Sequence, residues 1–421
     1  MKHILSEEKS ILIAPVLITL LVFCVPLSAS LKSIMSVLSL AAIILTPYYR
    51  KYLFDAFNTS WGRVTIAFFA FILIACLWSD APYSMRLSVI DKYSKVLYLP
   101  ILAVGFINSK TRRWAFNSYI AVMLFTCFLS LLKQKGYWAY NNPEDSGEVF
   151  HNHISTGYMV ALAVYFAGIL SFEANISKWQ RAYYFLMVAF GSYQIFFLNT
   201  GRTGYAVYGI LISLLIIQKL SFKKALIGIV LFCSSIGLVY MASPLMQMRT
   251  AALISDIKFL KKHEENTSLG FRVQFHNYAR SLFERHPIIG MGTGSFKYSF
   301  SIDQPIPSWD NKLNDPHSQY WLLLAEQGIL GIIALIIFLG TLFVTALKLE
   351  NTETRPIIIG FLISFCLASF TDSILCYSTA GTLLIIFCAL GFGEFLEKIV
   401  YKKEAVNDSV FSSSNKAVLA V

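Results

Sequence analysis

Apolar runs of roughly membrane-spanning length recur along the whole chain. A helix needs about 20 consecutive apolar residues to cross the hydrocarbon core of a bilayer, and shorter runs can tilt or re-enter. Twelve such runs predict an all-α polytopic membrane protein with about twelve transmembrane helices. They are residues 11–29, 31–48, 64–78, 96–108, 114–132, 154–172, 183–198, 204–220, 225–245, 320–347, 356–371 and 375–397.

The composition agrees with this class. Only 14% of the residues are charged and 56% are hydrophobic, whereas a soluble domain carries about 25% charged residues. These values exclude a disordered chain, a secreted disulfide scaffold and an ordinary cytosolic enzyme. The formal net charge of +11 does not indicate nucleic-acid binding, because the basic residues form neither a tail nor an arginine-rich helix.

Lysines and arginines are distributed unevenly between the predicted loops. With a cytoplasmic N-terminus, 19 of them lie on the cytoplasmic side and seven lie in short loops of the opposite, outer side. Because cations near span ends stay cytoplasmic, both termini are predicted to be cytoplasmic. The chain then divides into spans one to nine (1–244), a long outer loop (245–319), spans ten to twelve (320–400) and a cytoplasmic tail (401–421).

The long outer loop carries helical periodicity. Apolar residues recur at helical spacing within 253–260 and again within 271–282. In the second stretch Arg272, His276 and Arg280 are four residues apart, so they share the face away from the apolar stripe. We predict amphipathic helices that lie along the bilayer and offer cations to headgroups. A merely solvated polar face is the alternative.

Two short outer loops depart from the usual scarcity of cations. Arg202 lies in the sequence NTGRTG at 199–204, where the glycines would let an anion approach the backbone. A lipid-borne anion could meet Arg202 there, and snorkelling to the headgroups is the alternative. Arg86, Lys92 and Lys95 form a second, weaker cluster, because nearby aspartates can pair with it.

The outer loop leads directly into the tenth predicted span. Asp315 is a suitable N-cap and Pro316 a suitable first helical residue, so His317 is expected in the first helical turn. The helix N-terminus disfavours an imidazolium and Asp315 favours it, which leaves the sign of the pKa shift open. A neutral imidazole here is suited to general-base catalysis; a polar residue that ends a span is the alternative.

The glycines of GMGTGSF at 290–296 do not indicate a nucleotide site. No predicted strand precedes them and the outer side has no soluble nucleotide, so turns with positive φ account for them. The sequence also lacks an Asp-x-Asp pair and an outer-face His/Cys cluster with metal-ligand spacing. We therefore predict no metal and no cofactor.

Three stretches together resemble the O-antigen ligase and polymerase superfamily of bacterial envelope polysaccharide assembly. They are LNTGRTG at 198–204, residues 270–296 with GFR and HPIIGMG, and His317-Ser318 followed nine residues later by GILG at 328–331. About twelve spans with one large loop before the tenth also fit. Where relatives often carry tryptophan, this chain has Phe275.

The resemblance implies a membrane-embedded glycosyltransferase of the C type in the bacterial inner membrane, with its site facing the periplasm. Such enzymes transfer a glycan from undecaprenyl diphosphate to an acceptor hydroxyl. By position, Arg202 and Arg272 would bind the lipid diphosphate and His317 would activate the acceptor. Secondary candidates are Arg86, Lys95, His276 and Arg280.

The residue chemistry is compatible with this implication. The periplasm lacks ATP, so the donor must already be activated, and guanidinium groups match the charge that develops on a leaving diphosphate. A single base opposite the leaving group would invert the anomeric configuration.

Several functions stay open at this point. The spacing from His317 to the glycine pair favours a ligase with lipid A–core as acceptor, while a polymerase or a protein O-oligosaccharyltransferase would use the same donor. A transporter or lipid flippase is the alternative of another class. Such proteins carry ionisable residues and paired broken helices within their spans. The predicted span interiors contain almost no ionisable residues, and no paired Gly/Pro-broken helices occur in two matching halves.

Overall fold

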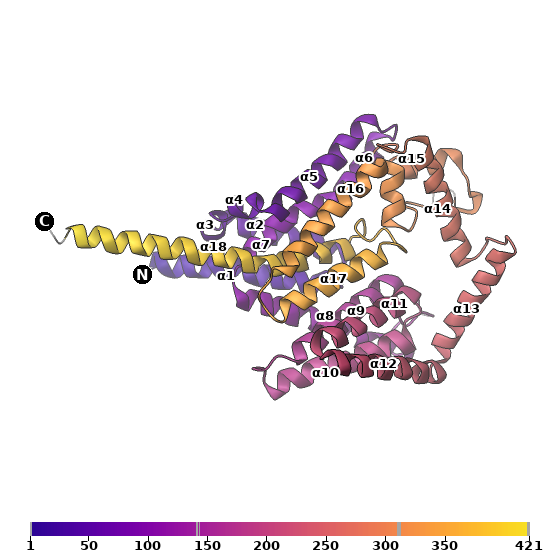
Figure 1. Cartoon of the computed structure of the whole chain (residues 1–421), viewed down its shortest axis with the longest axis horizontal. Helices are drawn as coiled ribbons and strands as arrows, with labels where there is room; N and C mark the ends of the chain where they lie inside the picture. The colour runs from indigo at the N-terminus through magenta and orange to yellow at the C-terminus, as the bar shows by residue number, and fades with distance from the viewer. Residues whose placement is uncertain (1, 140–141, 143, 310–312, 419–421) are drawn as a thin grey trace.

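The computed structural model describes residues 2–139, 142, 144–309 and 313–418. Within these residues the regular secondary structure is entirely helical, with turns and loops between the helices. The N- and C-terminal helices extend together from one end of the molecule, and α13 to α15 lie toward the other (Figure 1). The helices are α1 (Lys2–Cys24), α2 (Ala29–Leu45), α3 (Pro47–Arg50), α4 (Leu53–Asn58), α5 (Ser60–Ile74), α6 (Tyr83–Ser94), α7 (Tyr98–Gly105), α8 (Ser109–Gln134), α9 (His153–Ser171), α10 (Lys178–Tyr193), α11 (Arg202–Lys219), α12 (Phe222–Ala242), α13 (Pro244–Lys261), α14 (Ser268–Arg285), α15 (Ser295–Asp303), α16 (Gln319–Leu347), α17 (Thr354–Ala368) and α18 (Ala380–Val418).

Each of the twelve predicted apolar runs coincides largely with one of these helices. Among the described residues, five helices are long and apolar enough to cross a membrane: α8, α9, α12, α16 and α5 with the 3₁₀ turn after it. The bent pair of α2 with Pro47–Asn58 adds a sixth if it counts as one span. The helical fold agrees with a polytopic membrane protein. The count of twelve and the boundaries at 244, 319 and 400 stay predictions, and α18 continues as a helix through the predicted tail to Val418.

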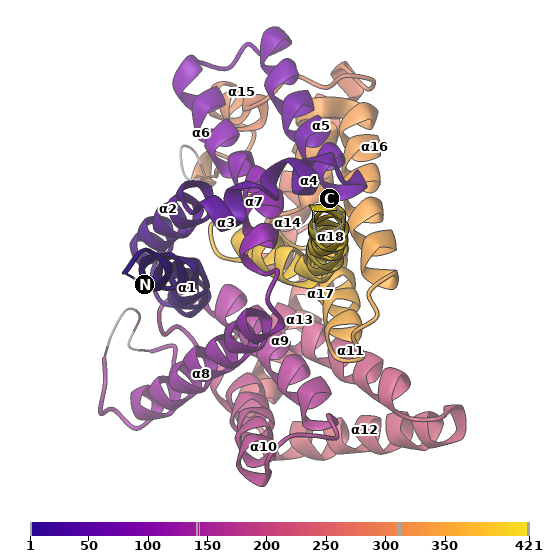
Figure 2. The ribbon, with the colours of Figure 1, turned by 90° about the vertical axis from the view of Figure 1, so that its left-hand side faces the viewer.

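Burial distinguishes central helices from peripheral ones. α9 is buried along almost its whole length because α8, α10, α11 and α17 pack around it, and Figure 2 shows this group below α5 and α16. α16 packs along α5, and α18 packs on α7 and α17. In contrast, α12 exposes Leu226, Ile227, Val230 and Leu231, as a helix that faces lipid would.

Loops assigned to one predicted side of the membrane gather together in space. Predicted cytoplasmic residues such as Arg113, Glu173 and Asn351 line one pocket. Predicted outer residues such as Lys32 and Asp315 line another. This sorting supports the alternation predicted from the charges, although the orientation itself stays a prediction.

A backbone junction joins α16 to the glycine turns before α15. Gly328 has φ +62° inside α16 and interrupts the helix. Around this break the N–H of Ile329 donates to the carbonyl of Pro287 (2.9 Å), and the N–H of Gly292 donates to the carbonyl of Glu326 (2.7 Å). Two of the stretches that carry the family resemblance are thus one structural unit. As predicted, Gly290, Gly292 and Gly294 all have positive φ.

Glu326, at the same junction, is an exception to the prediction that span interiors are nearly free of ionisable residues. It lies in α16 and is 2% exposed. The backbone N–H of Phe296 donates to its Oε1 (3.4 Å), and Gln327 contacts its Oε2 (3.5 Å). These contacts give the carboxyl group a structural role at the junction.

We expect Gly328→Ala to lower the free energy of unfolding by about 1–3 kcal/mol, because alanine is strained at positive φ. Its Cβ would also lie 2.5 Å from the carbonyl oxygen of Ile288. Gly340 is the matched control: it lies in the same helix, and no atom comes within 4 Å of an added Cβ. Gly340→Ala should be neutral or slightly stabilising. Thermal denaturation in detergent measures both variants, and equal midpoints would contradict the strained role of Gly328.

Candidate functional site

The segment before α16 does not follow the predicted capping pattern. His317 is not helical: α16 begins at Gln319, and its N-cap is Ser318, whose Oγ accepts from the N–H of Trp321 (3.4 Å). Asp315 instead accepts from the backbone N–H of His317 (3.0 Å). This local turn competes with helix capping and leaves His317 at φ +52°. Such strain in a non-glycine residue concentrates at functional sites.

The imidazole of His317 is bonded to a carboxylate that the sequence interpretation missed. Its Nδ1 lies 3.1 Å from Oδ1 of Asp372, which is 1% exposed. Because a carboxylate only accepts, Nδ1 carries the proton and Nε2 is left as the basic atom. The hydroxyl of Tyr377 also donates to Oδ1 of Asp372 (2.7 Å). Asp372 follows α17 in a predicted short outer connection, and no spacing relative to His317 indicated it.

The surroundings of His317 settle the direction of its pKa. Burial lowers the pKa of this imidazole, but the hydrogen bond that it donates to Asp372 and the negative charges of Asp315 and Asp372 outweigh burial, so the pKa lies above its ordinary value of 6.5. His317 is therefore a stronger base than a free histidine. It must lose its proton before it can act as one.

Helix α14 brings three of its residues toward His317. The positive charge of Arg272 acts on both imidazoles: it opposes the raised pKa of His317, and it adds to burial, the larger cause, in lowering the pKa of His276. Nε2 of His276 lies 3.5 Å from the carbonyl oxygen of His317. The ring of Phe275 lies 5.8 Å from the imidazole of His317. Arg280 does not join them, because it is exposed and pairs with Glu284 (2.8 Å).

Arg202 is the first residue of α11, and its side chain contacts α13. Both terminal nitrogens of its guanidinium lie 3.3 Å from Oδ2 of Asp256 on α13. The next residue, Thr203, lines a small cleft together with Asp372 and Tyr377. The Arg202 segment is therefore adjacent to the acid that holds His317, while the Arg202 side chain itself is held by Asp256.

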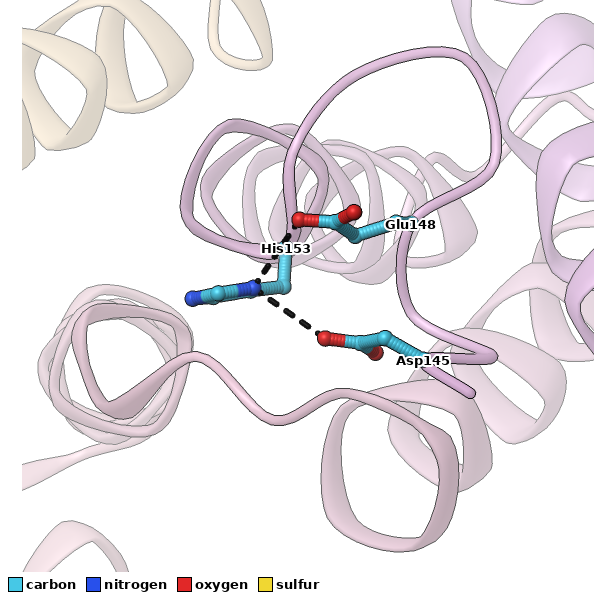
Figure 3. Close-up of side chains that lie close together, drawn as sticks. All are labelled: Asp145, Glu148 and His153. Atoms are coloured by element: carbon cyan, nitrogen blue, oxygen red, sulfur yellow. Dashed lines mark ion pairs between the residues drawn. The ribbon is translucent and has the colours of Figure 1, made fainter. Parts of the chain in front are cut away.

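A cluster of charged side chains fixes the loop before Arg202 (Figure 3). Nδ1 of His153 lies 3.1 Å from Asp145 and 3.2 Å from Glu148. The hydroxyl of Thr200 donates to Asp145, and the side-chain amide of Asn199 donates to the carbonyl of His153 (3.0 Å). These contacts hold the loop after the π-helical turn Gln194–Leu198, and such turns are frequent at functional sites.

The same three side chains offer ligand atoms within 4.8 Å of one another. The imidazole of His153 already contacts both carboxyl groups, and Asp145 is also engaged by Thr200 and by the N–H of Gly147. The cluster therefore holds the loop before Arg202 through contacts among its own side chains, and these contacts need no metal ion. The absence of a metal requirement stays a prediction.

The remaining secondary candidates support the backbone around the site. The ammonium group of Lys95 is buried and donates to the carbonyls of Leu375 (3.1 Å) and Tyr377 (2.9 Å). Lys95 thus positions the segment whose tyrosine bonds to Asp372. Arg86 donates to the carbonyl of Cys76 (3.0 Å).

The fold and this site define a helical membrane protein in which a buried acid–histidine pair lies beside helices that carry arginines. Residues 185–336 match the family model described as O-antigen ligase. This match supports an O-antigen ligase family assignment for the segment, and it confirms the resemblance predicted from its motifs. The matched segment contains Arg202, Arg272 and His317, whereas Asp372 lies beyond it.

The chain is also similar to a protein of Haemophilus influenzae. It is 26% identical over 308 residues, which cover 69% of this chain and 74% of the relative. It is described as an uncharacterized protein, so the likeness adds no activity.

Proposed function

We propose that the protein is an O-antigen ligase. It transfers O-antigen polysaccharide from undecaprenyl diphosphate to a sugar hydroxyl of lipid A–core, at the periplasmic face of the inner membrane. The observation that carries this proposal is the imidazole of His317, which is bonded through Nδ1 to buried Asp372 and lies near the cation of Arg272. This arrangement combines a base with a cation suited to a diphosphate.

The proposed reaction is a single displacement. Nε2 of His317 takes the proton of the acceptor hydroxyl, and the acceptor oxygen attacks the anomeric carbon of the donor. The bond from that carbon to the diphosphate breaks, and its electron pair leaves with undecaprenyl diphosphate. Asp372 stabilises the imidazolium that forms, as the acid of an acid–histidine pair does.

Arg272 and Arg202 serve the leaving group in this scheme. Guanidinium groups stay ionised and bind phosphate oxygens with two parallel hydrogen bonds. Arg202 would exchange Asp256 for the diphosphate, because its present contacts of 3.3 Å are longer than strong charge-assisted hydrogen bonds. Two cations at the leaving group make a metal ion unnecessary.

A polymerase and a protein O-oligosaccharyltransferase would use the same donor and the same cations. The spacing from His317 to Gly328 and Gly331 favours the ligase among the three. A deletion strain distinguishes the first two. Unsubstituted lipid A–core with accumulated lipid-linked chains indicates a ligase, and core that carries a single repeat indicates a polymerase.

We expect the purified protein to transfer glycan from undecaprenyl diphosphate to lipid A–core in the presence of a chelator and without nucleotide. Because His317 is a single base and no covalent intermediate is involved, the new linkage should have the inverted anomeric configuration. NMR of the product measures it. Retention of configuration, or loss of activity on chelation, would overturn the scheme. A reaction in which the chelator is saturated with magnesium is the control.

A further inference from the structure

A cavity of about 700 Å³ lies beside the acid–histidine pair and has no part in the scheme above. It is larger than the two neighbouring cavities, and its volume is typical of small-molecule sites. Segments of α2, α6 and α9 enclose it together with residues 314–315 and 376–382. All of them belong to predicted outer loops or to the outer ends of helices.

Hydroxyl and amide groups dominate the lining of this cavity. They include Ser33, Ser94, Asn152, Ser155 and Thr379. Serine and threonine hydroxyls both donate and accept, and amides offer two donors and an acceptor, so such a lining matches the alternating hydroxyls of a sugar. The lining indicates a polyhydroxylated ligand rather than an acyl chain.

Charged groups give the cavity a cationic edge. Three lysines and two aspartates line it, which leaves a formal charge of +1, and the lysines are Lys32, Lys92 and Lys95. Lys95 is engaged by backbone carbonyls, and Lys32 bonds to the hydroxyl of Ser378. Lys92 also lines the adjoining cavity of about 320 Å³, where Lys297 is a second cation and Asp315 and Glu326 are carboxyl groups. A negative substituent on the ligand would therefore be stabilised near Lys32 and Lys92.

The cavity is lined by direct neighbours of the acid–histidine pair, whereas His317 and Asp372 themselves are not part of its lining. Asp315, which bonds to the backbone of His317, and Tyr377, which bonds to Asp372, both line it. Among the described residues of its lining, neither Arg202 nor Arg272 occurs. A ligand in this cavity thus lies next to the residues that hold His317 and Asp372, at a place that the diphosphate-binding residues leave free.

We propose that this cavity binds the acceptor glycan and recognises it as a phosphorylated sugar, with Lys32 and Lys92 at the phosphate. The inference rests on the proposed function, because it divides the donor and the acceptor between the arginine-bearing helices and the lysine-lined cavity. It adds a substrate class and two specificity residues to that function.

Calorimetric titration of the full-length protein in detergent tests the proposal. The probe is the phosphorylated core oligosaccharide released from lipopolysaccharide, compared with its enzymatically dephosphorylated form. We expect Lys32→Gln/Lys92→Gln to weaken binding of the phosphorylated form by about tenfold or more, because two charged partners of the phosphate are lost. The dephosphorylated form should bind the wild-type protein about as weakly as the phosphorylated form binds the double variant. In transfer assays the double variant should raise KM for the acceptor and leave KM for the donor unchanged.

Lys223→Gln/Lys224→Gln is the matched control, since it removes two exposed lysines at the predicted cytoplasmic end; it should bind like the wild type. His317→Ala should bind the oligosaccharide and fail to transfer to it. If transfer proceeds while the Lys32/Lys92 variant keeps wild-type affinity and acceptor KM, the cavity proposal fails and the ligase stands. If the oligosaccharide binds in a lysine-dependent way but is never glycosylated, the ligase proposal fails and the anionic-sugar site stands.

Discussion

Arg272→Ala is expected to lower kcat for glycan transfer by about 10²–10³-fold, the loss typical when one fixed donor to a developing anion is removed. Arg272 lies on α14, close enough to His317 for its charge to affect the imidazole, and in the proposed reaction it would act where the diphosphate leaves. Arg272→Lys should recover little of this loss, because an ammonium cannot make two parallel hydrogen bonds to phosphate. Single-turnover rates with saturating undecaprenyl-diphosphate glycan measure the effect.

Arg280 provides the control from the same helix. It lies two turns further along, is exposed and pairs with Glu284, so Arg280→Ala should keep kcat within about twofold, as a surface pair contributes little. Arg202→Ala should resemble Arg272→Ala if both arginines bind the diphosphate. Full activity of Arg272→Lys would show that two-pronged binding is not required, and full activity of Arg272→Ala would remove this residue from the site.

The sequence predicts the helices well because their cause is local. A run of apolar residues with few charges forms a helix wherever it is buried or in lipid. Each of the twelve predicted runs therefore coincides largely with a helix. Periodicity likewise predicts α13 and α14. How many of these helices cross the bilayer depends on tilt and packing rather than on local composition, and therefore could not be settled from the runs.

The site shows the opposite situation. Asp372 lies 55 residues from His317 in sequence, and only the packing of α16 and α17 brings the two together. The capping prediction for Asp315 is wrong for a related reason: Ser318 competes for the helix end, and Asp315 bonds to the turn instead. The clamp of Asp145, Glu148 and His153 joins residues that are close in sequence, but its contacts with Asn199 and Thr200 depend on the tertiary fold.

Family motifs carried information that composition could not. They indicated Arg272 and His317, and the charge of Arg272 acts on the imidazole of His317. They also indicated Arg202, whose neighbour Thr203 lines a cleft together with Asp372. They also indicated Gly328, although not its physical role. That role is the backbone junction with residues 287–292, which fixes the outer loop to α16.

Asp372→Asn is expected to lower kcat by about 10²–10⁴-fold and to change its pH dependence. Asparagine can present its amide to Nδ1 and favour the wrong tautomer, which is costly in acid–histidine pairs. The pH effect follows from the charge. Asp372 helps to raise the pKa of His317, so its neutral replacement should lower that pKa. Since the base must be deprotonated, the acid limb of the remaining activity should move to lower pH.

The pH profile of kcat/KM, followed from pH 5 to pH 9, separates this electrostatic role from a structural one. A variant that is merely misfolded would lose activity at every pH without moving the limb. Asp303→Asn is the control, because Asp303 is an exposed carboxylate whose partners are Arg285 and Tyr278 rather than His317; its profile should match the wild type. An acid limb that stays in place in Asp372→Asn, or moves to higher pH, would mean that His317 is not the base whose proton limits the reaction.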